Sequence, residues 1–210
     1  TFSRNFIWIT FKIIMENYIK KLLIICLLSI FYNPFQGQNI FFKSYGGNGN
    51  DYGENIISTR DSGFLAIGAT ESYGNGLTDM YFVKTDKDGN VLWHKAYGGA
   101  NIDYGKSVVE TLDSGFIACG YSNSENLNYD IFLVKINKNG ILQWSKSIGG
   151  NDWDFGNRII KSVIDSNHFY IVGKTFSYGS INGDGFVLKI NSFGDSLWMK
   201  TYGGNMEDEF

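Results

Sequence analysis

Residues 103–150 read DYGKSVVETLDSGFIACGYSNSENLNYDIFLVKINKNGILQWSKSIGG, and the same pattern recurs along most of the chain. A pair of glycines closes each copy, and the residue before the pair recurs at spacings of 52, 51 and 54 residues. The four copies of this tripeptide are Tyr45-Gly46-Gly47, Tyr97-Gly98-Gly99, Ile148-Gly149-Gly150 and Tyr202-Gly203-Gly204. A period of this length is the signature of a repeat architecture, in which each period forms one structural unit.

Each period contains short runs of residues that favour β-strands. In the second repeat these runs are Ser107–Glu110, Phe116–Tyr121, Ile131–Asn137 and Ile141–Ser147. The turns at 112–115 and 138–140 separate them with residues that tolerate a left-handed backbone. The third run is apolar at nearly every position instead of alternating, which is typical of a strand buried on both faces. The sequence therefore predicts an all-β fold of four-stranded antiparallel sheets that cover one another.

A four-stranded unit of about 50 residues matches one blade of a β-propeller, in which neighbouring sheets bury both faces of each blade. We expect three full blades at about 54–97, 106–148 and 157–202. Residues 39–45 match the outer strand of a closing blade, and residues 205–210 match the start of the next blade. Three blades plus fragments fall below the usual 4–8 blades. We therefore expect an incomplete ring, from either a truncated product or a segment of a longer gene.

The N-terminal residues form a separate segment. Residues 15–38 have the layout of a secretory signal peptide, with Lys20 and Lys21 ahead of an apolar run at 22–32. This run is shorter than the roughly 20 residues that span a bilayer, and an uncleaved membrane anchor is the competing interpretation. We interpret residues 1–14 as non-native sequence upstream of the true start. Export predicts a secreted or cell-surface location, with no membrane span after signal cleavage.

The charge balance argues against a nucleic-acid partner. The formal net charge is −3, and the chain after residue 38 holds 14 basic and 20 acidic residues. A surface that follows phosphates needs clustered Lys and Arg, and the sequence has no such cluster. Cys119 is the single cysteine after the signal segment. Because no cationic residue flanks it, we expect it to be a small buried apolar side chain.

Four short motifs carry a family resemblance. They read W-x-K-x-Y-G-G, D-Y-G, D-S-G-F and D-x-F-L-V-K, and together they cover residues 41–210. This combination resembles the propeller-like repeats of large secreted bacterial proteins, which often end in a type IX secretion sorting domain. The resemblance implies the repeat type and says nothing of an activity. The chain departs from the pattern at Ile148, at Asn167-His168 and at Glu209-Phe210, and no sorting domain is visible.

Few residues suit catalysis or metal binding. His94 and His168 occupy different phases of the repeat and lack a partner at the spacing of a metal site. Residues 86–90 (DKDGN) resemble the start of a calcium loop, but their glycine stands at position four instead of six. We predict a hairpin turn there and no cofactor, with Ca²⁺ as the one ion left open.

One end of the blades is the candidate ligand face. The connections at this end carry Asp51, Tyr52, Asp103, Tyr104, Trp153, Asp154 and Tyr178. Aromatic rings beside Asp and Asn suit sugar stacking and hydroxyl recognition, or calcium. The alternative is that the recurring aspartates accept backbone N–H groups in glycine-rich turns. We expect the recurring Trp93, Trp144 and Trp198 to be packing anchors.

These observations favour an exported, non-enzymatic module that binds or scaffolds a glycan or a protein, with the remaining blades of its own chain as further partners. The alternative is a secreted glycan-active enzyme whose site lies in a missing part of the propeller. Catalysis needs an odd, non-repeated acid or histidine among the channel residues, and we identify none from the sequence.

Overall fold

The computed structural model describes residues 42–125, 128–180, 182–208 and 210. All described residues belong to one compact unit, at 41–210. The predicted upstream segment at 1–14 and the signal peptide at 15–38 lie outside the described residues. In the described part of the chain, no helix is long and apolar enough to cross a membrane.

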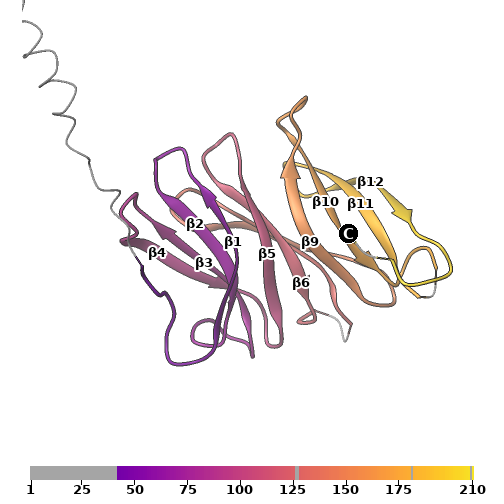
Figure 1. Cartoon of the computed structure of the whole chain (residues 1–210), viewed down its shortest axis with the longest axis horizontal. Coiled ribbons are helices and arrows are strands. Elements are labelled where there is room, and N and C mark those ends of the chain that lie inside the picture. The colour runs from indigo at the N-terminus through magenta and orange to yellow at the C-terminus, as the bar shows by residue number, and fades with distance from the viewer. Residues whose placement is uncertain (1–41, 126–127, 181, 209) are drawn as a thin grey trace, which may run out of the picture. The chain divides into compact units, whose positions relative to one another are not determined.

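The described residues form three antiparallel sheets of four strands each and no helix, which confirms the all-β prediction (Figure 1). We call these sheets blades 1, 2 and 3. Blade 1 consists of β1 (Asp51–Ser58), β2 (Phe64–Thr70), β3 (Asp79–Thr85) and β4 (Val91–Tyr97). Blade 2 consists of β5 (Asp103–Glu110), β6 (Phe116–Ser122), β7 (Asp130–Ile136) and β8 (Leu142–Ile148). Blade 3 consists of β9 (Asp154–Lys161), β10 (His168–Thr175), β11 (Asp184–Asn191) and β12 (Ser196–Tyr202).

Strand order within each blade follows the sequence, so every connection is a hairpin. The first strand lies at one edge of its sheet and the fourth at the other. The blades stand side by side with blade 2 in the middle, and β5 contacts both β1 and β9 (Figure 1). The described sheets do not close into a ring.

Both faces of the middle blade are buried. One face packs Phe116 and Val134 against Leu65 and Phe82 of blade 1. The opposite face packs residues such as Leu133 into a second core shared with blade 3. All seven residues of β7 are buried, as the continuous apolar run predicted. Apolar burial between blades therefore holds the repeat together.

Each sheet begins at the aspartate, three residues before the expected blade start. In blade 2 the first strand was expected from Ser107, but β5 begins at Asp103. The Asp103 N–H donates to the Thr78 carbonyl of blade 1 at 2.8 Å, which the sequence pattern of one repeat cannot reveal. A β-bulge between Gly105 and Ser107 then shifts the register and leaves the residue between them out of the ladder.

The hairpin turns match the sequence prediction. Ser114 (φ 60°) and Gly140 (φ 74°) have a left-handed backbone in the two turns of blade 2. Residues 86–90 also form a hairpin turn, in which the Asp86 carboxylate accepts the N–H groups of Asp88 and Asn90. Gly89 is left-handed there with φ 75°, so this segment is a hairpin turn, as predicted.

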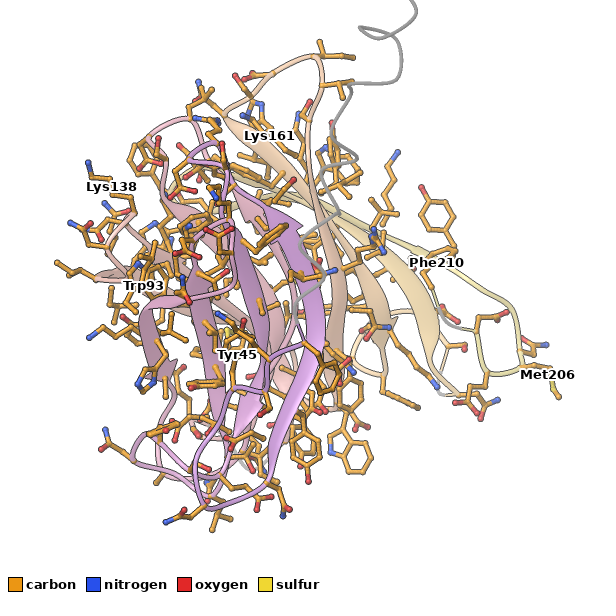
Figure 2. The ribbon with its side chains drawn as sticks, turned by 60° about the vertical axis from the view of Figure 1, so that its left-hand side comes forward. Tyr45, Trp93, Lys138, Lys161, Met206 and Phe210 are labelled. Atoms are coloured by element: carbon orange, nitrogen blue, oxygen red, sulfur yellow. The ribbon has the colours of Figure 1, made fainter. Side chains whose placement is uncertain are left out.

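Recurring aromatic residues join each blade to the next. The indole N–H of Trp93 donates to the Lys138 carbonyl at 3.2 Å, and both residues lie on the same side of the ribbon (Figure 2). A Cβ atom on Gly140 would lie 2.9 Å from the Trp93 ring, so this turn position needs glycine for close approach as well as for its φ. Trp144 packs on Gly194 in the same way. Trp93 and Trp144 are therefore packing anchors, as predicted.

Candidate functional site

The recurring aspartates hold two loops together at one end of each blade. The Asp103 carboxylate accepts the Gly99 N–H and the Ser124 hydroxyl, both at 2.7 Å. The same two contacts join Asp51 to Gly47 and Ser72, and Asp154 to Gly150 and Ser177. Each carboxylate thereby links the loop before the first strand to the loop after the second strand.

These carboxylates serve the scaffold. Asp103 is 1% exposed and Asp154 is 0% exposed, so neither presents its charge to solvent. One oxygen of each lacks a hydrogen-bond partner, but the corresponding oxygen of Asp51 accepts the Thr70 hydroxyl. Hydroxyl residues stand opposite the other two aspartates in the same register, at Ser122 and Thr175.

A second set of buried aspartates lies next to the first. A Cβ atom on Gly98 would lie 2.3 Å from Asp103 Oδ2 and 2.4 Å from Asp79 Oδ1, so the glycine lets the two carboxylates approach. Burial and then the Asp103 charge raise the pKa of Asp79. These aspartates occur as pairs, and the part of the chain that the structure describes contains no group of three His, Cys, Asp or Glu that could hold a metal ion.

Aromatic rings form a continuous row beside the aspartates, across all three blades. Tyr52 lies 6.1 Å from Tyr104, which stacks on Tyr121 at 5.3 Å between centroids. From Tyr121 the row continues through Phe155 at 5.2 Å to Trp153. We call this row the aromatic band; its members are Tyr52, Tyr104, Tyr121, Tyr129, Trp153, Phe155 and Phe176. Tyr52 is 45% exposed and Trp153 is 49% exposed, so both ends of the band present ring surface to solvent.

Tyr178 lies outside this band. Its hydroxyl donates to the Gly149 carbonyl at 2.9 Å, and Tyr73 makes the matching contact to Gly46 in blade 1 at 3.0 Å. Burial and then the charge of Asp154 raise the pKa of Tyr178. The structure thus brings six of the seven predicted positions to one end of the blades, namely Asp51, Tyr52, Asp103, Tyr104, Trp153 and Asp154. It leaves Tyr178 as a support of the loop before β9.

A polar hollow of about 320 Å³ adjoins the band along the first strands. We call it the first-strand hollow; it is lined by Glu54, Asn55, Lys106, Ser107, Asn157 and Arg158. Lys106 Nζ lies 3.2 Å from the Glu54 carboxylate and 5.1 Å from the centre of the Tyr104 ring. Burial and then a hydrogen bond to Glu54 raise the pKa of Tyr104, so this hydroxyl stays protonated.

Three of these lining residues occupy β-bulges. The register of the first two strands shifts at the same place in each blade, around Glu54, Lys106 and Asn157. A bulge can aim its extra residue away from the ladder. The bulge residues of blades 1 and 2, Glu54 and Lys106, carry opposite charges and line the same hollow.

From the sequence we identified no odd, non-repeated acid among the channel residues, but one acid of this kind lines the hollow. Glu54 is such an acid, because Lys106 and Asn157 occupy its position in the other repeats. The signal was present in the sequence: the two residues after each aromatic-glycine pair vary, while the pair itself recurs. The two histidines do not line the hollow: His94 packs on Tyr73, and His168 pairs with Asp165. Cys119 is buried and free, and burial raises the pKa of its thiol.

Compared with models of protein families and with curated proteins, the sequence matches neither a family nor a curated protein.

Proposed function

We propose that this chain is a non-enzymatic, exported binding module of β-propeller type, and that a glycan lies along its aromatic band and first-strand hollow. The observation that carries the proposal is the band itself, which crosses three blades and exposes Tyr52 and Trp153. Ligand sites in proteins combine aromatic surface with a few placed polar groups. The hollow supplies such groups directly beside the rings.

The blade arrangement supports the propeller part of this proposal. Blade 2 is covered on both faces by quasi-equivalent neighbours, which is how a propeller buries its sheets. The first strands contact one another in sequence, so residues at their bulges would face a common central space in a closed ring. The predicted signal segment at 15–38 supports the exported part.

The geometry favours binding over glycan cleavage. Glycoside hydrolysis generally uses two carboxyl groups, one on each side of the scissile bond. Of the six residues that line the hollow, Glu54 alone is a carboxylate, and Lys106 holds it in an ion pair. A carboxylate with a cation at 3.2 Å is better suited to orient sugar hydroxyls than to donate a proton.

A glycan array and a pull-down with the purified chain test the proposal. We expect a glycan hit whose affinity falls about tenfold in Trp153→Ala and in Tyr52→Ala, which corresponds to about 1.4 kcal/mol. Trp198→Ala is the matched control, because Trp198 is also partly exposed but lies on the outer strand of blade 3. Absence of any glycan hit, or equal binding by Trp153→Ala, would refute the proposal. A partner found only by pull-down would replace the glycan with a protein.

A further inference from the structure

A second pocket lies between blades 2 and 3, at the end opposite the aspartates. Its volume is about 330 Å³. It is lined by the β5–β6 turn, the start of β8, and the hairpin turns β9–β10 and β11–β12 of blade 3. We call it the interblade pocket; its main side chains are Asp113, Lys135, Gln143, Trp144, Asn167 and Phe193.

The corresponding space between blades 1 and 2 is crossed by one side chain. The Arg60 guanidinium donates to the carbonyls of Leu112 and Thr111 at 3.1 and 3.0 Å. Its Nε lies 4.0 Å from Glu110, which also accepts the Arg60 backbone N–H. Arg60 thereby bridges the two hairpin turns and occupies the space between them.

Leu112 takes the place of Arg60 in blade 2. Both residues stand between Thr and Asp in the same turn of the repeat. Leu112 is 56% exposed and has no polar group that could bridge to blade 3. The facing turn of blade 3 is also longer than in the other blades, and its Ser166 and Asn167 line the pocket. Leu112 and the longer turn of blade 3 therefore leave the junction between blades 2 and 3 open, whereas Arg60 fills the junction between blades 1 and 2.

The tryptophan at the open junction has a spare donor. Trp93 donates its indole N–H to Lys138 at the filled junction. Among the described residues, no acceptor contacts the indole N–H of Trp144, although its ring rests on Gly194 in the same way. Trp144 therefore offers a fixed ring and an unused N–H donor to the pocket.

The charged groups of the pocket balance each other. Lys135 Nζ lies 3.0 Å from Asp113 Oδ1 and donates to the Thr111 hydroxyl at 2.6 Å. Burial opposes ionisation of Asp113, but hydrogen bonds from Thr111 and Lys135 outweigh it and lower its pKa to about 2. Asp113 is therefore ionised near neutral pH, and its ion pair with Lys135 adds no net charge to the pocket. The other polar lining groups are amides and hydroxyls, which both donate and accept hydrogen bonds.

We propose that the interblade pocket binds a neutral sugar, with one sugar face on the Trp144 ring and hydroxyl groups on Gln143 and Asn167. An uncharged polyhydroxyl ligand matches a pocket with no net charge, an aromatic platform and groups that donate and accept. A pocket of this size lies at the lower end of the range for small-ligand sites, which fits a ligand of one or two sugar rings. This site is separate from the aromatic band and does not rest on the proposed function.

Leu112→Arg tests the proposal, because it introduces at this junction the side chain that fills the other one. The purified chain is titrated with the methyl glycosides of glucose, galactose, mannose and N-acetylglucosamine, and separately with glucuronic acid and glucosamine. Binding is followed by calorimetry and tryptophan fluorescence. We expect 1:1 binding of at least one neutral glycoside, weakened at least tenfold by Leu112→Arg. Leu197→Arg, which adds an arginine on exposed β12, is the matched control and leaves binding unchanged.

Trp144→Phe provides a second variant that keeps a ring but removes the N–H donor. We expect it to weaken binding several-fold, while Trp198→Ala, on the outer strand of blade 3 and outside the pocket lining, leaves binding at this pocket unchanged. The proposal is overturned if no neutral glycoside binds at about 10 mM, a concentration at which a site with a Kd of about 1 mM would be about nine-tenths occupied. Stronger binding of a charged sugar, or unchanged binding in both Leu112→Arg and Trp144→Phe, would overturn it as well.

Discussion

The sharpest test of blade packing is a pair of glycines that share one motif position. Gly105 on β5 faces blade 1: a Cβ atom there would lie 2.7 Å from Ile67 Cγ1 and 2.8 Å from both Met80 Cγ and the Gly68 carbonyl oxygen. Gly53 on β1 is its counterpart, and a Cβ atom there would have nothing within 4 Å. Neither glycine has a positive φ, so alanine adds no backbone strain at either position.

The two substitutions should therefore have opposite effects. Overpacking a well-packed core typically costs about 1–3 kcal/mol, and contact with a backbone carbonyl limits relaxation at Gly105. Replacing glycine where space and φ allow stabilises by about 0.4–1 kcal/mol, because the unfolded chain loses freedom. We expect Gly105→Ala to lower the free energy of unfolding by about 1–2 kcal/mol and Gly53→Ala to raise it by about 0.5 kcal/mol.

Urea unfolding followed by circular dichroism measures both changes. For a domain of this size, a total difference of roughly 2 kcal/mol corresponds to roughly 4–8 °C in Tm. Equal effects of the two substitutions would refute the packing argument. If Gly53→Ala is as destabilising as Gly105→Ala, another sheet covers blade 1 in solution. If Gly105→Ala is neutral, blades 1 and 2 do not pack as described.

Three further substitutions test the charged groups, each by urea unfolding. Asp103→Ala removes a carboxylate that accepts both the Gly99 N–H and the Ser124 hydroxyl, and we expect it to lower the free energy of unfolding by about 3 kcal/mol at pH 7. Its control is Asp88→Ala, which breaks an exposed ion pair and should change the free energy of unfolding by less than about 0.5 kcal/mol. Asp79→Asn should stabilise the protein at pH 7, because the folded state raises the pKa of Asp79 and so disfavours its ionised form. The gain should shrink as the pH falls through the raised pKa of native Asp79, which becomes protonated. Asp113→Asn should destabilise the protein at pH 6 and have no effect near pH 2: folding lowers the pKa of Asp113 from 3.8 to about 2, so its contribution is present above pH 3.8 and is lost as the pH falls through about 2.

The strands and turns could be predicted because each depends on its own residues. The run at 131–136 is apolar on both faces, and the turn at 138–140 has a glycine where a left-handed residue is needed. The start of β5 could not be predicted in the same way. Its first hydrogen bond is to Thr78, which lies on the neighbouring blade.

Phe210, which departs from the repeat pattern, likewise depends on a contact that the sequence of its own repeat does not reveal. From the sequence, Phe210 stands where the other repeats have glycine, with no visible reason. In the structure its ring lies over Gly185, where a Cβ atom would come within 2.6 Å of it. Gly185 in turn stands where blade 2 has Ile131, whose side chain packs near Gly156. Blade 2 supplies a large residue, Ile131, against the small Gly156, whereas blade 3 supplies the small Gly185 against the large Phe210. Each of the two departures from the repeat therefore compensates for the other.

The candidate site is marked by residues that differ between the repeats, whereas the fold is marked by residues that recur. The residues that recur in every repeat, such as Asp103 and Trp93, bond or pack within the scaffold. Several positions that vary between repeats line open space: Glu54 and its counterparts at the first-strand bulges, and Leu112 where blade 1 has Arg60. A repeat must keep the contacts that stack its blades, so only positions outside those contacts are free to differ. Comparing the repeats with one another therefore separates scaffold from site more effectively than searching for conserved-looking motifs. By this criterion the variable positions, and not the recurring aspartates, are the residues to mutate first.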